Sequence, residues 1–173
     1  MCSKKITVFL LTLICVMVGI FFYQHTVQKR DRILVGDFLE VKRSVGIQIS
    51  KLENLENSCK DVANELNDFI TAAEKSKTKG HANRVKTIKE DLESINRQKL
   101  KVKELKEAAS SLKNDIYGLL SKCQVGKVSR ENKDSISNLS ILADNVKRDS
   151  NTIIRESDAM LGAIRDRNMR QSE

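Results

Sequence analysis

The chain has 173 residues and a formal net charge of +8; 31% of its residues are charged, 40% are hydrophobic and only 4% are aromatic. It contains no Pro, no Trp and seven Gly, and its length suits one domain. Turn-rich sandwiches and barrels need turn residues in quantity, so the composition argues against a β-rich fold. It predicts an all-α protein built from long helices.

The first element is the uncharged run ITVFLLTLICVMVGIFFY, residues 6–23. A membrane-spanning helix needs about 20 apolar residues, with a lower limit near 17. The run therefore predicts a transmembrane signal-anchor, preceded by a short tail, 1–5, and followed by a basic juxtamembrane segment, 24–37. The expected membrane-anchor residues are Ile6, Phe9, Leu10, Leu13, Val16, Val18, Ile20, Phe21, Phe22 and Tyr23.

A cleaved signal peptide is the alternative interpretation of this run. The sequence FFYQHTVQ after it lacks the small-x-small pattern of a cleavage site, and the run exceeds the usual 7–15 residues of a signal peptide core. The basic residues on its two sides nearly balance, so the orientation rule for Lys and Arg gives little guidance. We expect a single-pass protein of the endomembrane system or cell surface, with its C-terminal portion lumenal or extracellular rather than cytoplasmic.

A heptad pattern begins after the juxtamembrane segment and indicates a helical domain over 38–168. Its first segment alternates spacings of three and four, which is typical of a helix with one buried seam. The stretch KSKTKGHAN, 75–83, interrupts it and predicts a loop. Ten of the seam residues are apolar or nearly so, and Gln48 is the exception: Phe38, Val41, Val45, Gln48, Leu52, Leu55, Cys59, Val62, Leu66, Phe69 and Ala73.

Two further segments follow, separated by a second predicted loop at 125–134, and a polar tail, 169–173, ends the chain. In the second segment Lys99 takes the seam position before Val102, and a three-residue slip then falls between Val102 and Leu105. The third seam is weaker because Ser150 and Ser157 interrupt it. The main seam residues of the two segments are Ile88, Leu92, Leu105, Leu112 and Leu119, then Leu139, Val146, Ile153 and Met160.

Charge differs between the segments. Residues 33–74 carry four basic and eight acidic residues, whereas 85–123 carry nine basic and six acidic residues. Opposite charge favours packing of these two helices side by side in a three-helix bundle. A parallel coiled coil formed by two chains is the alternative, and charged helical faces that are merely solvated are equally common.

Catalytic and metal chemistry have little material in this sequence. The only histidines are His25, at the edge of the apolar run, and His81, in the predicted loop; no Gly-rich phosphate loop or hydrolase motif is present. The four cysteines form no CxxC pair. We therefore expect no enzyme, no cofactor, no metal and no small-molecule substrate.

Cys59 and Cys123 both fall on seam positions and are candidate disulfide residues, although each also suits a small buried hydrophobe. In an antiparallel hairpin they would lie ~36 Å apart along the axis, too far for a bridge. A bridge between two copies of Cys59 would fit a parallel dimer. Cys2 is a candidate for acylation if it faces the cytosol. Asn138 begins a glycosylation sequon, which matters only in a lumenal or extracellular domain.

Function follows from this architecture only in outline. Acidic residues interleave with the basic ones and aromatics are few, so nucleic acid is not an expected partner. Attraction of Lys29, Arg30 and Arg32 to anionic lipid headgroups explains that cluster more economically. We expect a single-pass membrane-anchored helical protein acting as tether, scaffold or assembly subunit, with the bilayer, protein partners or a second copy as partners. The alternative is a membrane-stalked or secreted three-helix-bundle binding module, receptor-like or ligand-like.

Overall fold

The computed structural model describes the backbone of residues 2–76, 81–123 and 128–170, and the side chains of 14–75, 83–123 and 128–168. The described residues form three α-helices and no strand. Helix α1 spans Cys2–Ser76, α2 spans His81–Lys122 and α3 spans Arg130–Arg170. The absence of proline explains why helices of 75, 42 and 41 residues run without interruption.

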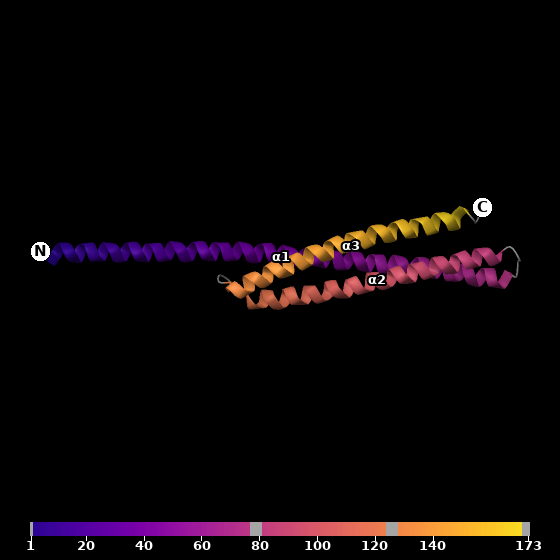
Figure 1. The fold of residues 1–173 in the computed structure, drawn as a ribbon, viewed down its shortest axis with the longest axis horizontal. Coiled ribbons are helices and arrows are strands. Elements are labelled where there is room, and N and C mark those ends of the chain that lie inside the picture. The colour runs from indigo at the N-terminus through magenta and orange to yellow at the C-terminus, as the bar shows by residue number, and fades with distance from the viewer. Residues whose placement is uncertain (1, 77–80, 124–127, 171–173) are drawn as a thin grey trace.

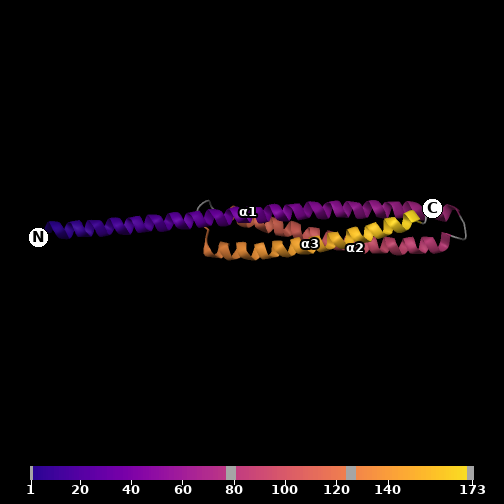
Figure 2. The same cartoon turned by 90° about the horizontal axis from the view of Figure 1, so that it is seen from above.

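The C-terminal part of α1 packs with α2 and α3 in an antiparallel three-helix bundle (Figure 1). Helix α2 runs back along α1, and α3 runs in the direction of α1 again (Figure 2). Each helix contacts both others. The expected all-α fold is confirmed in this form, and the chain closes its seams within one molecule instead of extending as a single coiled-coil rod.

Helix α1 continues without a break from the apolar run into the bundle, and its N-terminal part extends alone beyond α2 and α3 (Figure 1). The packed part reaches back to Asp31, whose side chain is only 2% exposed. Leu34 and Val35 also pack against the core. The bundle therefore begins inside the segment 24–37 that the sequence assigns to a juxtamembrane linker, because a polar seam residue at 31 hides the start of the pattern.

The ends of the helices carry ordinary capping features. Helix α1 has Lys75 in its last turn and α2 has Lys122 there, where a cation interacts favourably with the helix dipole. At the start of α3, the Ser129 hydroxyl accepts a hydrogen bond from the backbone N–H of Asn132 at 3.2 Å, and Glu131 lies in the first turn. The end of α1 at Ser76 and the start of α2 at His81 fall within the predicted interruption 75–83, and α3 starts at Arg130, within 125–134. Helix α2 ends at Lys122, before the second predicted interruption, and α3 reaches Arg170, inside the predicted tail.

The core consists of two hydrophobic clusters, one toward each end of the bundle. The cluster near the α1–α2 hairpin includes Leu52, Val62 and Ile95. The cluster nearer the free part of α1 includes Phe38, Leu112 and Ile136. Each cluster takes residues from all three helices, so each half of the bundle has a core of its own.

Candidate functional site

The packing seam is the feature that sequence reasoning singled out most fully, and the structure places each of its main apolar residues in one of the two clusters. Nine of the seam residues in the predicted set are buried, and eight are partly buried and packed against the buried ones. The buried residues are Phe38, Val45, Leu52, Leu55, Val62, Leu66, Ile88, Leu112 and Leu119. The partly buried ones are Val41, Phe69, Leu92, Leu105, Leu139, Val146, Ile153 and Met160.

The seam of α2 has a different phase from the one expected between residues 95 and 105. Gln98 is buried, with 8% exposure, whereas Lys99 is only partly buried. With Gln98 and the buried Asp91 in the seam, spacings of three and four continue along α2 and the expected three-residue slip disappears. The prediction that Lys99 occupies the seam was wrong. A search for apolar residues overlooks polar side chains that a hydrogen bond or an ion pair stabilises in the core.

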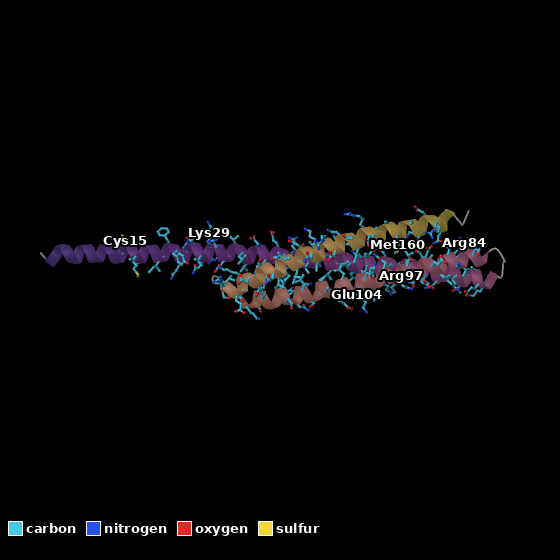
Figure 3. All side chains as sticks on the ribbon, viewed as in Figure 1. Cys15, Lys29, Arg84, Arg97, Glu104 and Met160 are labelled. Carbon is cyan, nitrogen blue, oxygen red and sulfur yellow. The ribbon has the colours of Figure 1, made fainter. Side chains whose placement is uncertain are left out.

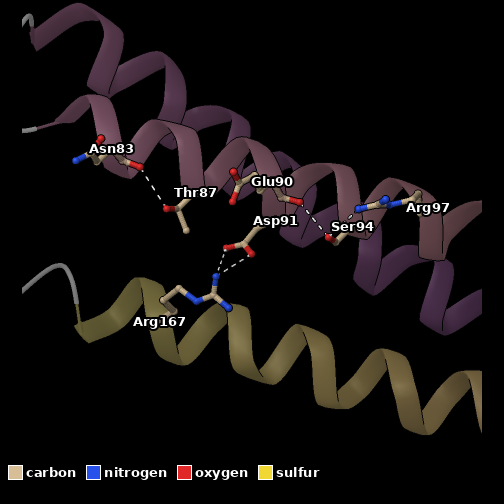
Figure 4. Close-up of polar contacts among 7 residues, drawn as sticks. All are labelled: Asn83, Thr87, Glu90, Asp91, Ser94, Arg97 and Arg167. Carbon is tan, nitrogen blue, oxygen red and sulfur yellow. Dashed lines mark hydrogen bonds and ion pairs between the residues drawn. The ribbon is translucent and has the colours of Figure 1, made fainter.

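A buried hydrogen bond holds Gln98 in the core. Its side-chain amide Nε2 donates to Ser157 Oγ of α3 at 2.9 Å, and the Ser157 hydroxyl donates in turn to the Ile153 carbonyl at 2.7 Å. Asp91 is bound by Arg167 of α3, whose Nη1 lies 3.1 Å from Oδ1 and 3.4 Å from Oδ2 (Figure 4). These polar contacts therefore specify how α2 aligns with α3, because a hydrogen bond or ion pair needs one particular partner whereas apolar contacts are less specific.

Two further polar side chains lie between the two hydrophobic clusters. Gln48 of α1 is 4% exposed and Ser150 of α3 is fully buried. Neither Gln48 Oε1 nor Ser150 Oγ has a hydrogen-bond partner among the described residues. Unpaired buried polar groups cost free energy, so this level is a weak point of the bundle core.

Ion pairs fix the register of α1 against α2. Glu74 pairs with Lys89 at 3.3 Å near the hairpin, and Glu56 pairs with Lys106 farther along. The Lys106 ammonium lowers the pKa of Glu56 by donating a hydrogen bond to its carboxylate, and Glu56 raises the pKa of Lys106. In both pairs the acid belongs to α1 and the base to α2, which is the charge complementarity that the sequence predicts for these two helices.

Asp31 joins the start of the packed part of α1 to the start of α3. Its Oδ2 accepts a hydrogen bond from the Val128 backbone N–H at 2.9 Å, and its Oδ1 lies 2.6 Å from Lys133 Nζ. The Lys133 ammonium, together with the hydrogen bond from Val128, lowers the pKa of Asp31 against the opposing effect of burial. Sequence reasoning missed this residue because it follows Arg30 and precedes Arg32, in a stretch that looks like a solvated basic cluster.

The cysteines do not pair with one another in the part of the chain that the structure describes. Cys59 and Cys123 are buried free thiols in different clusters, and Cys15 is an exposed free thiol on the extended part of α1 (Figure 3). Burial raises the pKa of the Cys59 and Cys123 thiols, which keeps them protonated and unreactive. Because the two thiols lie in different clusters, they do not bridge within one chain, and a seam-to-seam bridge between two copies would require the bundle to open at Cys59.

The expected membrane-anchor residues lie on the free part of α1. From residue 14 onward they are exposed along the helix: Val16, Val18, Ile20, Phe21, Phe22 and Tyr23. The side chains of Ile6, Phe9, Leu10 and Leu13 lie outside the described residues, as do those of Cys2 and His81. Within the described part of the chain, no helix combines the length and the apolar character needed to cross a membrane.

Asn138, the sequon residue, is exposed on α3. No group of three or more His, Cys, Asp or Glu side chains that could hold a metal ion occurs among the described residues. No protein-family model matches the chain, and neither curated proteins nor solved structures show significant similarity to it.

Proposed function

We propose that the chain is a single-pass membrane protein whose three-helix bundle acts as a tether, scaffold or assembly subunit through contacts with other proteins. The observation that carries the proposal is the continuity of α1, which runs as one helix from the apolar run 6–23 into the bundle core. A continuous helix keeps the bundle at a fixed distance from the environment in which the N-terminal run is embedded. The run is uncharged and has basic residues on both sides, and both features support a lipid bilayer as that environment.

The closed seams determine which surfaces are left for partners. Because α1, α2 and α3 bury their apolar stripes against one another, a partner would bind the outer faces of the bundle. These faces carry scattered exposed apolar side chains, among them Leu39 and Ile47 on α1, Leu100 on α2, and Leu142 on α3. This arrangement also favours the second candidate function, a membrane-stalked or secreted binding module, over self-association through the heptad seam.

Alkaline carbonate extraction of membranes from cells that express the full-length chain tests the anchor. We expect the protein to remain in the pellet. The matched control is the double variant Ile14→Arg, Val18→Arg, which keeps the length of the run and places two charges within it; each charge costs about 2.5–3.5 kcal/mol at the centre of a spanning helix. Recovery of the unaltered protein in the soluble fraction, with an N-terminus beginning after residue 19, would show a cleaved signal and remove the anchor.

Glycosylation at Asn138 reports the side of the membrane on which the bundle lies. The Asn138 side chain is exposed, so the sequon is accessible in the folded bundle. A lumenal bundle should gain a glycan that shifts its electrophoretic mobility and that Asn138→Gln removes. A protease assay on the unsubstituted protein in sealed microsomes tests the same point independently. A bundle that is digested only after detergent is added is lumenal, and a bundle that is digested without detergent is cytoplasmic.

A further inference from the structure

Folding brings basic residues from three separate parts of the sequence to one end of the bundle. Lys29, Arg30 and Arg32 are exposed on α1 on either side of Asp31, where the packed region begins. Lys122 is exposed in the last turn of α2, and Arg130 is exposed at the start of α3. The contacts of Asp31 place these groups together. Its carboxylate binds the Val128 backbone N–H, two residues before α3 begins, and Lys133 in the first turns of α3.

The acidic residues at this end do not neutralise the basic ones. Over 29–32, 122 and 130–134 there are six basic residues and three acidic ones, Asp31, Glu131 and Asp134. Asp31 is already occupied by Lys133. The remaining five basic side chains form no ion pair with any described residue, so their charge is available to an external anion. They are Lys29, Arg30, Arg32, Lys122 and Arg130.

The same end of the bundle lies next to the apolar run. From Tyr23, the last residue of the run, to Asp31 the unbroken helix α1 advances about 12 Å at 1.5 Å per residue. A headgroup layer adds roughly 5–7 Å to each side of the hydrocarbon core, and the Debye length at physiological ionic strength is about 8 Å. The basic side chains of α1 therefore stand within about one Debye length of a lipid surface when the run spans the bilayer. The register of the pairs Glu56–Lys106 and Glu74–Lys89 places Lys122 level with about residue 40 of α1, about 13 Å farther from the membrane than Asp31, so its contact with lipid requires the bundle to tilt toward the surface.

We propose that this basic end of the bundle, formed by Lys29, Arg30, Arg32, Lys122 and Arg130, docks on anionic lipid headgroups. The inference rests on the membrane anchor proposed above and adds that the α2–α3 end of the folded bundle supplies part of the lipid contact. The sequence shows only the cluster on α1, whereas the fold adds the charges of α2 and α3. Each basic residue near an anionic surface raises the docked population about fivefold, so the orientation of the bundle depends on lipid charge.

A single introduced tryptophan tests the proposal on the full-length protein. The chain has no native Trp, so Ser121→Trp, at an exposed position in the last turn of α2, is the only indole. The protein is reconstituted in phosphatidylcholine vesicles with and without phosphatidylserine, in both cases with a lipid that carries a nitroxide quencher on its headgroup. We expect stronger quenching in the anionic vesicles, and loss of the difference when salt is raised, since exposed charges are screened.

The charge-reversal variant Lys122→Glu, Arg130→Glu should remove the dependence of quenching on lipid charge. Its matched control is Lys86→Glu, Arg165→Glu at the far end of the bundle. Both pairs make the same change in net charge and place one reversal near a helix N-terminus and one near a C-terminus, so helix-dipole effects are balanced. Thermal unfolding by circular dichroism checks that both variants fold.

Quenching equal in the two vesicle types, or reduced equally by both variants, overturns the docking proposal and leaves the anchor intact. Flotation of the vesicles separates this result from failure of the anchor itself. A protein that does not float with either vesicle type has no anchor, and the docking proposal falls with it.

Discussion

The phase of the α2 seam can be tested by removing Gln98 and Lys99 in turn. Gln98→Ala removes a buried hydrogen bond to Ser157, worth about 0.5–1.5 kcal/mol net, and one buried methylene group, worth about 0.8 kcal/mol. Ser157 keeps its bond to the Ile153 carbonyl and so does not become an unpaired donor. We expect a loss of about 1.3–2.3 kcal/mol from the free energy of unfolding.

Lys99→Ala is the control, since Lys99 neighbours Gln98 in sequence and lies only partly buried. Its effect should stay within about 0.5 kcal/mol, as for most surface changes. The assay is urea unfolding of the full-length protein in mild detergent, followed by circular dichroism. A double-mutant cycle with Ser157→Ala isolates the hydrogen bond. A Lys99→Ala loss equal to or larger than that of Gln98→Ala would show that Lys99, and not Gln98, occupies the seam of α2.

Three other predictions concern the core, the bundle end and the buried thiol. Leu112→Asp should unfold the bundle, because it loses about 1.5–3 kcal/mol of apolar burial and adds an unpaired buried charge. The control Glu53→Lys changes an exposed residue and should leave the melting curve nearly unchanged, and equal effects of the two variants would contradict the assigned seam. Because the pKa of Asp31 is lowered in the folded state, its carboxylate contributes stability above about pH 4, and this contribution is lost as the pH falls through the pKa of the folded state. Asp31→Asn should therefore make the melting temperature fall less steeply in acid. A melting temperature that depends on pH equally in both proteins would count against the contact with Lys133. Cys59 should react with thiol reagents only when urea opens the bundle, and rapid formation of a covalent dimer that Cys59→Ser abolishes would favour a parallel coiled coil instead.

Much of the architecture is predictable because long helices with apolar seams leave a strong period in the sequence. The stripes through Leu52, Leu55 and Val62 on α1 and through Leu112 and Leu119 on α2 need only spacing and side-chain type to be recognised. Opposite charge on the first two helical segments also indicates their pairing, and the ion pairs of Glu56 and Glu74 realise it.

The parts that escaped prediction are polar residues inside the seam. Asp31, Asp91 and Gln98 are buried because partners on other elements satisfy them, and those partners lie 59 to 102 residues away in sequence. A pattern based on hydrophobicity assigns such residues to the surface and shifts to the next residue, as it does at Lys99. The continuity of α1 across 24–37 was missed for the same reason, since polar residues there conceal the heptad.

The distance between Lys60 on α1 and Lys101 on α2 tests the central claim, a bundle that closes its seams within one chain. Both side chains are exposed, and the flanking pairs Glu56–Lys106 and Glu74–Lys89 place the two residues at one level. Nitroxide labels at these positions, measured by pulsed electron paramagnetic resonance on the full-length protein in vesicles diluted with unlabelled chain, should lie no more than ~25 Å apart, because packed helix axes are about 8–10 Å apart. One continuous helical rod would instead separate them by about 60 Å at 1.5 Å per residue, and a distance near that value would contradict the bundle.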